Sequence, residues 1–183
     1  MIGVLAVIAI LAGMLIPKIF EAIRNSRINA TLEAYNTLKA AALDNYAKWG
    51  RFASNNLPYT GTEFDNVLFI EGRIDAKASD KIPLTVGSAT NIYLSVTTGI
   101  GNGSSGYDLD GNGSADTTNA AAVVELVIGS VSGRDARDLS LRLDGPSMSA
   151  TDDSSADSKG RVEYAAPSGN PKATTVYMYI THQ

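Results

Sequence analysis

The apolar positions divide the chain into three parts. Residues 1–16 (MIGVLAVIAILAGMLI) contain no charged or polar side chain, and Pro17 and Lys18 follow directly. From Ile19 to Gly50, apolar residues recur every three or four positions, which is the period of one face of an α-helix. After Gly50, short apolar runs alternate with stretches rich in Gly, Ser, Thr, Asn and Asp. The pattern predicts an α+β protein with an N-terminal helix over residues 1–50 and an antiparallel-sheet head over residues 51–183.

The second half of the helix is expected to pack against the head. Its apolar face is about one helical stripe wide, and Gly50 is a natural C-terminal stop. The residues expected to contact the head are Ile28, Leu32, Tyr35, Tyr46 and Trp49. Pro17 removes a backbone hydrogen bond inside the helix, so we expect a kink and a flexible joint there.

The head is expected to carry a small sheet that is completed near the C-terminus. Strands are predicted over residues 66–74, 91–97, 161–165 and 174–180, and a helix over residues 135–143. In the last strand, Val176, Met178 and Ile180 alternate with tyrosines, which indicates one buried face. Residues 120–128 fit either a short helix or a buried strand. Residues 146–159 are polar and are expected to form an exposed loop.

The apolar run at the start is short for a membrane span. A helix of sixteen residues covers about 24 Å, whereas the hydrocarbon core of a bilayer is about 30 Å thick. A secretory signal peptide would need a basic start and a small-residue cleavage site, and neither is clear in this sequence. The run is therefore expected to find its apolar neighbours in lipid or in other helices.

Residues 4–18 (VLAVIAILAGMLIPK) resemble the N-terminal helix of type IV pilins and of type II secretion pseudopilins. In that family the mature chain starts a few residues earlier, with an N-methylated Phe and a nearby glutamate, so we expect the natural start to lie upstream. The resemblance implies a pilin-like fold and a structural subunit of an extracellular or periplasmic type IV pilus-like helical filament. The residues expected to pack in the filament core are Val4, Val7, Ile8, Leu11, Leu15, Ile16 and Pro17.

The resemblance also implies partners and a location. Residues 1–18 would hold the subunit in the inner membrane before assembly. Inner-membrane machinery would then add the subunit to a homo-oligomeric filament at the cell surface. Two alternatives stay open, namely the major pseudopilin of a periplasmic pseudopilus and a membrane-anchored, calcium-stabilised binding module.

Composition argues against two other classes of function. The single histidine, His182, lies next to the C-terminus, and the chain has no cysteine, so a nucleophilic enzyme is not expected. The formal net charge is −4, and no basic patch with interleaved aromatic residues is visible. Binding to nucleic acid is therefore not expected.

Residues 108–119 (DLDGNGSADTTN) have the spacing of an EF-hand-type calcium loop. Calcium takes six to eight oxygen ligands, and alternate positions of a tight loop direct oxygens toward one centre. The expected ligands are Asp108, Asp110, Asn112, Ser114, Asp116 and Asn119. The twelfth position holds Asn119 where the EF-hand has a bidentate Glu, so we expect a weak affinity, roughly 10⁻⁴ to 10⁻³ M. A plain turn rich in Gly, Asn and Asp is the alternative.

Overall fold

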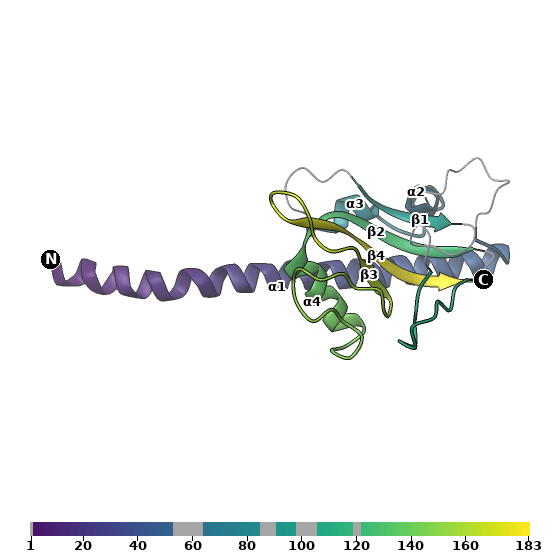
Figure 1. The fold of residues 1–183 in the computed structure, drawn as a ribbon. Coiled ribbons are helices and arrows are strands. Elements are labelled where there is room, and N and C mark those ends of the chain that lie inside the picture. Colours follow the sequence, from purple (N-terminus) through teal and green to yellow (C-terminus); the bar gives the residue numbers. More distant parts are fainter. Residues whose placement is uncertain (1, 53–63, 85–90, 98–105, 119–121) are drawn as a thin grey trace.

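A computed structural model describes residues 2–52, 64–84, 91–97, 106–118 and 122–183, without the side chains of residues 2, 4–7 and 9. The architecture is α+β, as predicted: a long N-terminal helix lies along one face of a four-stranded antiparallel sheet (Figure 1). Smaller helices and loops surround the sheet. The N-terminal part of the long helix projects away from everything else in the described chain.

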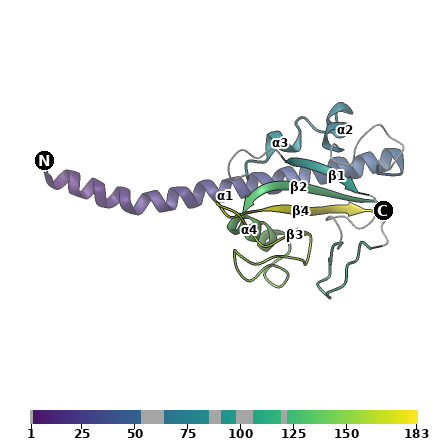
Figure 2. The same ribbon diagram turned by 45° about the horizontal axis from the view of Figure 1, so that its top comes forward.

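The long helix, α1 (Ile2–Trp49), contains 48 residues and is about 70 Å long at the standard rise. We call residues 2–23 the stalk and the remainder of the chain the head; the N-terminal part of the stalk projects beyond the sheet (Figure 2). Pro17 lies inside α1, and the helix continues through it. In the described residues of this single chain, the helix is therefore not interrupted at Pro17.

The sheet has the strand order β1-β2-β4-β3, and every neighbouring pair is antiparallel. Its strands are β1 (Ile92–Thr97), β2 (Val123–Ser132), β3 (Val162–Tyr164) and β4 (Ala173–His182). The predicted strands over residues 91–97, 161–165 and 174–180 are confirmed. The ambiguous run over residues 120–128 is a strand from Val123 onward, and residues 119–121 lie outside the described chain.

The described part of the head also contains three short helices: α2 (Phe64–Ile70), α3 (Ala78–Lys81) and α4 (Gly133–Leu143). The helix predicted over residues 135–143 is confirmed, and the Ser132 side chain caps it by accepting a hydrogen bond from the Asp135 amide. The strand predicted over residues 66–74 is wrong, because α2 occupies most of it. Phe64, Val67 and Leu68 are buried at helical spacing there, and a short apolar run does not distinguish a buried strand from a buried helix.

The main core lies between α1 and the sheet. Val176, Met178 and Ile180 of β4 are buried, as their alternation predicted. From α1, Ile28 and Tyr35 are fully buried, and Leu32 is partly buried against the same core. The Tyr35 hydroxyl donates a hydrogen bond of 2.5 Å to the Tyr179 carbonyl, and burial raises the pKa of Tyr35 to about 12.

Of the other two residues expected to pack against the head, Tyr46 is only partly covered and Trp49 is exposed. Tyr46 is 38% exposed at the edge of the buried stripe, where its ring stacks on Phe52 at 4.8 Å between centroids. Trp49 is 56% exposed because α1 ends there and no further turn covers it. The Lys48 ammonium lies 4.9 Å from the centre of the Trp49 ring. The periodicity identified the right face of α1 but not where the head stops covering it.

The polar segment over residues 146–159 is a mostly exposed loop, as predicted, but it contains one buried carboxylate. Asp157 accepts hydrogen bonds from the Ser140 hydroxyl at 2.7 Å and from the Ala150 and Lys159 amides. Desolvation raises the pKa of Asp157 despite these hydrogen bonds. This side chain therefore fastens the loop to α4.

Within the described residues, no helix is both long enough and apolar enough to cross a membrane. The expectation of an inner-membrane location before assembly is therefore wrong for this part of the chain. The physical reason is the shortness of the apolar run, since sixteen residues reach only about 24 Å and charged side chains begin at Lys18.

Candidate functional site

The stalk carries a continuous set of exposed apolar side chains. Its large members range from 45% exposed at Ile23 to 71% exposed at Met14. We call this set the stalk surface: Ile8, Ile10, Leu11, Met14, Leu15, Ile16, Ile19, Phe20 and Ile23. Soluble proteins rarely leave so many large apolar side chains in contact with water, and patches of this kind mark interaction sites.

Four of the predicted filament-packing residues belong to the stalk surface, namely Ile8, Leu11, Leu15 and Ile16. Pro17 is exposed beside them, and the side chains of Val4 and Val7 lie outside the described part of the structure. The sequence reasoning missed Ile10, Met14, Ile19, Phe20 and Ile23. The signal that could have found Ile10 and Met14 is the apolar character of all sides of residues 2–17, because a helix that is apolar all round is normally buried.

Helix α4 holds α1 where the stalk leaves the head. The Arg24 guanidinium forms ion pairs with Asp135, at 2.5 Å, and with Asp138. One helical turn farther, Arg142 donates hydrogen bonds to the side-chain oxygens of Asn25, at 2.7 Å, and Asn29, at 2.5 Å. These polar contacts fix the direction in which the stalk projects.

The predicted calcium loop lies on the face of the sheet opposite α1. Tyr107 is fully buried there, and its hydroxyl donates a hydrogen bond of 2.8 Å to Glu125 on β2. Its ring also lies 5.3 Å from that of Tyr179. Burial, with the Glu125 carboxylate next to it, raises the pKa of Tyr107 well above its usual value. Tyr107, which directly precedes the loop, therefore anchors the start of the loop on the sheet.

The loop brings three of the predicted ligands together. One carboxylate oxygen from each of Asp108, Asp110 and Asp116 can be chosen such that all three lie within 4.8 Å of one another. The Gly113 amide donates to Asp108 Oδ2 at 2.9 Å, and the Leu109 amide donates to Asp116 Oδ2 at 2.8 Å. Gly113 has a φ of 90°, which favours glycine, so the sharp turn between the carboxylates depends on it.

One oxygen of Asp108 distinguishes this cluster from an ordinary polar turn. The residue is 5% exposed, and its Oδ1 oxygen is buried without a hydrogen-bond partner. Leaving a buried charged oxygen without a partner is costly. A cation between the three carboxylates would satisfy this oxygen, and a set of hard oxygen donors suits calcium or magnesium rather than softer metals.

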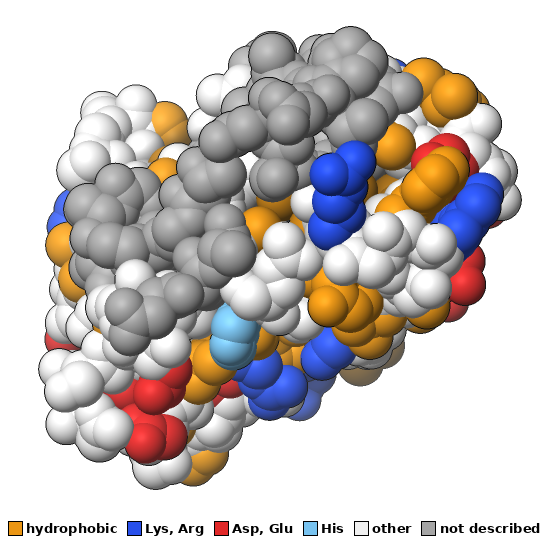
Figure 3. Space-filling view, turned by 90° about the vertical axis from the view of Figure 1, so that its right-hand side faces the viewer, with side chains coloured by type: hydrophobic (Ala, Val, Ile, Leu, Met, Phe, Trp, Pro, Cys, Tyr) orange, Lys and Arg blue, Asp and Glu red, His pale blue; other side chains and the backbone are white. Residues whose placement is uncertain are grey.

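The other three predicted ligands are placed differently. The Asn112 side chain accepts a hydrogen bond from the Ser114 amide at 2.8 Å and donates one to Asp110 at 2.8 Å. Ser114 is exposed, and Asn119 lies outside the described residues. In the described loop, the candidate site is therefore a cluster of three carboxylates supported by local hydrogen bonds. Figure 3 shows acidic side chains gathered on the end of the head remote from the stalk.

Comparison of the chain with known protein families, with curated proteins and with solved structures found no match.

Proposed function

We propose that this protein is a structural subunit of a type IV pilus-like helical filament, assembled through the stalk surface. The observation that supports this most directly is the unshielded apolar stalk. The similarity of residues 4–18 to the pilin N-terminal helix and the packing of a long helix on an antiparallel sheet agree with it.

The size of the stalk surface is appropriate for association. At roughly 100 Å² for each of nine half-exposed side chains, the stalk offers on the order of 900 Å² of apolar area, compared with about 800 Å² per partner in a standard interface. Sister copies are suitable partners because each brings the same stalk, whose residues 2–17 carry no charge. A helical bundle of stalks would remove these side chains from water while the heads lie outside.

The test is polymerisation of purified protein, followed by electron microscopy and sedimentation. Wild-type protein is expected to form filaments, and Leu15→Glu is expected to abolish them because it places a charge in the apolar bundle. Ile70→Glu is the matched control, since Ile70 is also exposed, at 66%, but lies on α2 away from the stalk. Near-ultraviolet circular dichroism of the tyrosines checks that both heads fold. Wild-type protein that stays monomeric at high concentration would contradict the proposal.

We also propose that the cluster of Asp108, Asp110 and Asp116 binds calcium and thereby stabilises the head. The buried, unpartnered Oδ1 of Asp108 supports this proposal over a plain turn. Bound calcium would supply positive charge to three closely spaced carboxylates, and the protein contributes the preformed loop. Calorimetric titration with calcium is expected to show one weak site, and Asp110→Asn is expected to weaken it. No heat of binding up to about 10 mM calcium would contradict this proposal, because the weakest dissociation constants of EF-hand-type loops lie near 10⁻³ M.

A further inference from the structure

A groove lies at the base of the stalk, where α1 meets the head. It encloses about 350 Å³. We call it the base groove; its lining residues are Phe20, Ile23, Arg24 and Arg27 of α1, and Pro83, Leu84 and Asp135. Phe20 and Ile23 remain 67% and 45% exposed, so nothing in the described chain fills the groove.

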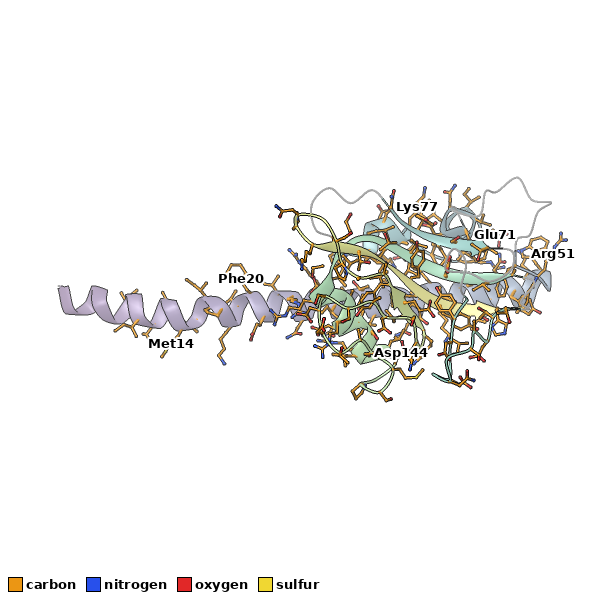
Figure 4. The ribbon with its side chains drawn as sticks, viewed as in Figure 1. Met14, Phe20, Arg51, Glu71, Lys77 and Asp144 are labelled. Atoms are coloured by element: carbon orange, nitrogen blue, oxygen red, sulfur yellow. The ribbon has the colours of Figure 1, made fainter. Side chains whose placement is uncertain are left out.

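A second face of the stalk has the same spacing of residues as the base groove. Phe20, Ile23 and Arg27 follow one another at intervals of three and four, and so do Met14, Pro17 and Glu21, six positions earlier. Six residues rotate a helix by about 600°, so the two faces lie about 120° apart around the axis. Figure 4 shows Met14 and Phe20 on different sides of the stalk. These two are the most exposed of the large apolar side chains described, at 71% and 67%.

The charges on these two faces are complementary. In the described residues, neither Glu21 on one face nor Arg27 on the other has an ion-pair partner. Lys18, beside Glu21, also has none. Arg24 at the groove is paired with both Asp135 and Asp138. These three side chains, which we call the Arg24 group, together carry one net negative charge and can therefore attract a lysine.

We propose that the base groove binds the stalk of a second copy of this chain, parallel to the first and displaced along it by six residues, about 9 Å. At this register, Met14 of the second copy meets Phe20, Pro17 meets Ile23, and Glu21 meets Arg27. Its Lys18 meets the Arg24 group with its excess negative charge. One displacement therefore matches two apolar contacts and two charged contacts at once.

The proposal rests on the proposed function and adds the register of the subunits. The two contacting faces are different surfaces of one helix, so the contact is heterologous. Each bound copy still presents its own free groove to the next copy. Such a contact produces an open helical polymer rather than a closed two-fold dimer.

Charge reversal tests the register. Glu21→Arg alone, or Arg27→Glu alone, places like charges opposite each other, and the critical concentration for assembly is expected to rise roughly tenfold at low salt. The two changes together in one chain restore the pair and are expected to return the critical concentration to near the wild-type value. Glu33→Arg is the matched control, because Glu33 is exposed on the same helix away from the groove. It is expected to change assembly little.

Cysteine cross-linking provides an independent readout, because residues 1–183 contain no cysteine. Met14→Cys and Phe20→Cys in one chain are too far apart for an internal disulfide, since six residues separate their Cα atoms by more than about 7 Å. After oxidation, filaments of this double variant are expected to give a ladder of disulfide-linked multimers on a non-reducing denaturing gel. The control variant with Met14→Cys and Glu33→Cys is expected to give no such ladder.

The outcomes separate the two proposals. Wild-type filaments that lack the 14–20 ladder and tolerate both charge reversals would overturn the register while leaving the filament function in place. Efficient dimers of the single variant Met14→Cys would point to a symmetric contact and would also overturn it. Wild-type protein that does not polymerise overturns the filament function, and the register with it.

Discussion

Replacing Asp108 with Asn tests the calcium site through the sign of its effect on stability. Asn has nearly the same shape as Asp and can still accept the hydrogen bond from the Gly113 amide that Asp108 Oδ2 accepts at 2.9 Å. It removes one of three negative charges that lie within 4.8 Å of one another. Without a divalent cation, the variant is expected to be as stable as the wild type or more stable, because charge repulsion in the cluster decreases.

Calcium is expected to reverse this order. At 10 mM calcium and a dissociation constant of roughly 10⁻⁴ to 10⁻³ M, binding to the folded state adds about 1.4 to 2.7 kcal/mol to the free energy of unfolding. For a chain of this length that corresponds to a rise in Tm of about 3 to 10 °C. Asp108→Asn is expected to lose most of this rise, since it removes the buried ligand oxygen.

The assay is thermal unfolding of the full chain, followed by near-ultraviolet circular dichroism with calcium or with a chelator. Asp80→Asn is the control, because Asp80 is exposed on α3 and has no side-chain hydrogen bond or ion pair in the described structure. It should respond to calcium as the wild type does. Equal Tm values for wild-type protein in calcium and in chelator would refute the reasoning, and so would a calcium response that survives in Asp108→Asn.

Three further predictions concern the head. Tyr35→Phe is expected to cost about 1 to 3 kcal/mol in urea unfolding, because it leaves the Tyr179 carbonyl without its buried donor, whereas Tyr46→Phe at the exposed edge should cost little. Gly133→Ala is expected to destabilise the protein by about 1 to 3 kcal/mol or more, since a Cβ there would lie 2.0 Å from the Asp153 carbonyl oxygen. Gly13→Ala is the control, because a Cβ at that position meets nothing within 4 Å and should leave the unfolding of the head unchanged. Burial raises the pKa of Asp157 above its usual 3.8, so the contribution of Asp157 to stability decreases as pH rises through the folded-state pKa. Between pH 4 and 7, the free energy of unfolding of Asp157→Asn should therefore fall less than that of the wild type. Parallel curves of stability against pH for the two proteins would contradict this.

Much of the fold could be predicted from local patterns. The three-to-four spacing along α1 and the alternation in β4 both arise from one-sided burial, which leaves a direct trace in the order of residues. The strand predicted over residues 66–74 failed because Phe64, Val67 and Leu68 form a run too short for its period to be decided. Trp49 was misplaced for a different reason: a stripe shows which side of a helix is buried, but the length of the neighbouring sheet decides where burial ends.

The candidate site divides in the same way. By itself, the sequence determined that residues 1–16 are uniformly apolar and that Asp108, Asp110 and Asp116 stand at ligand spacing, since both follow from residue type and distance along the chain. The tertiary structure alone decided that Asp108 Oδ1 is buried without a partner and that Arg27 faces the groove formed with Pro83 and Leu84. Burial and pairing depend on segments far apart in the chain, and no local pattern encodes which of them meet.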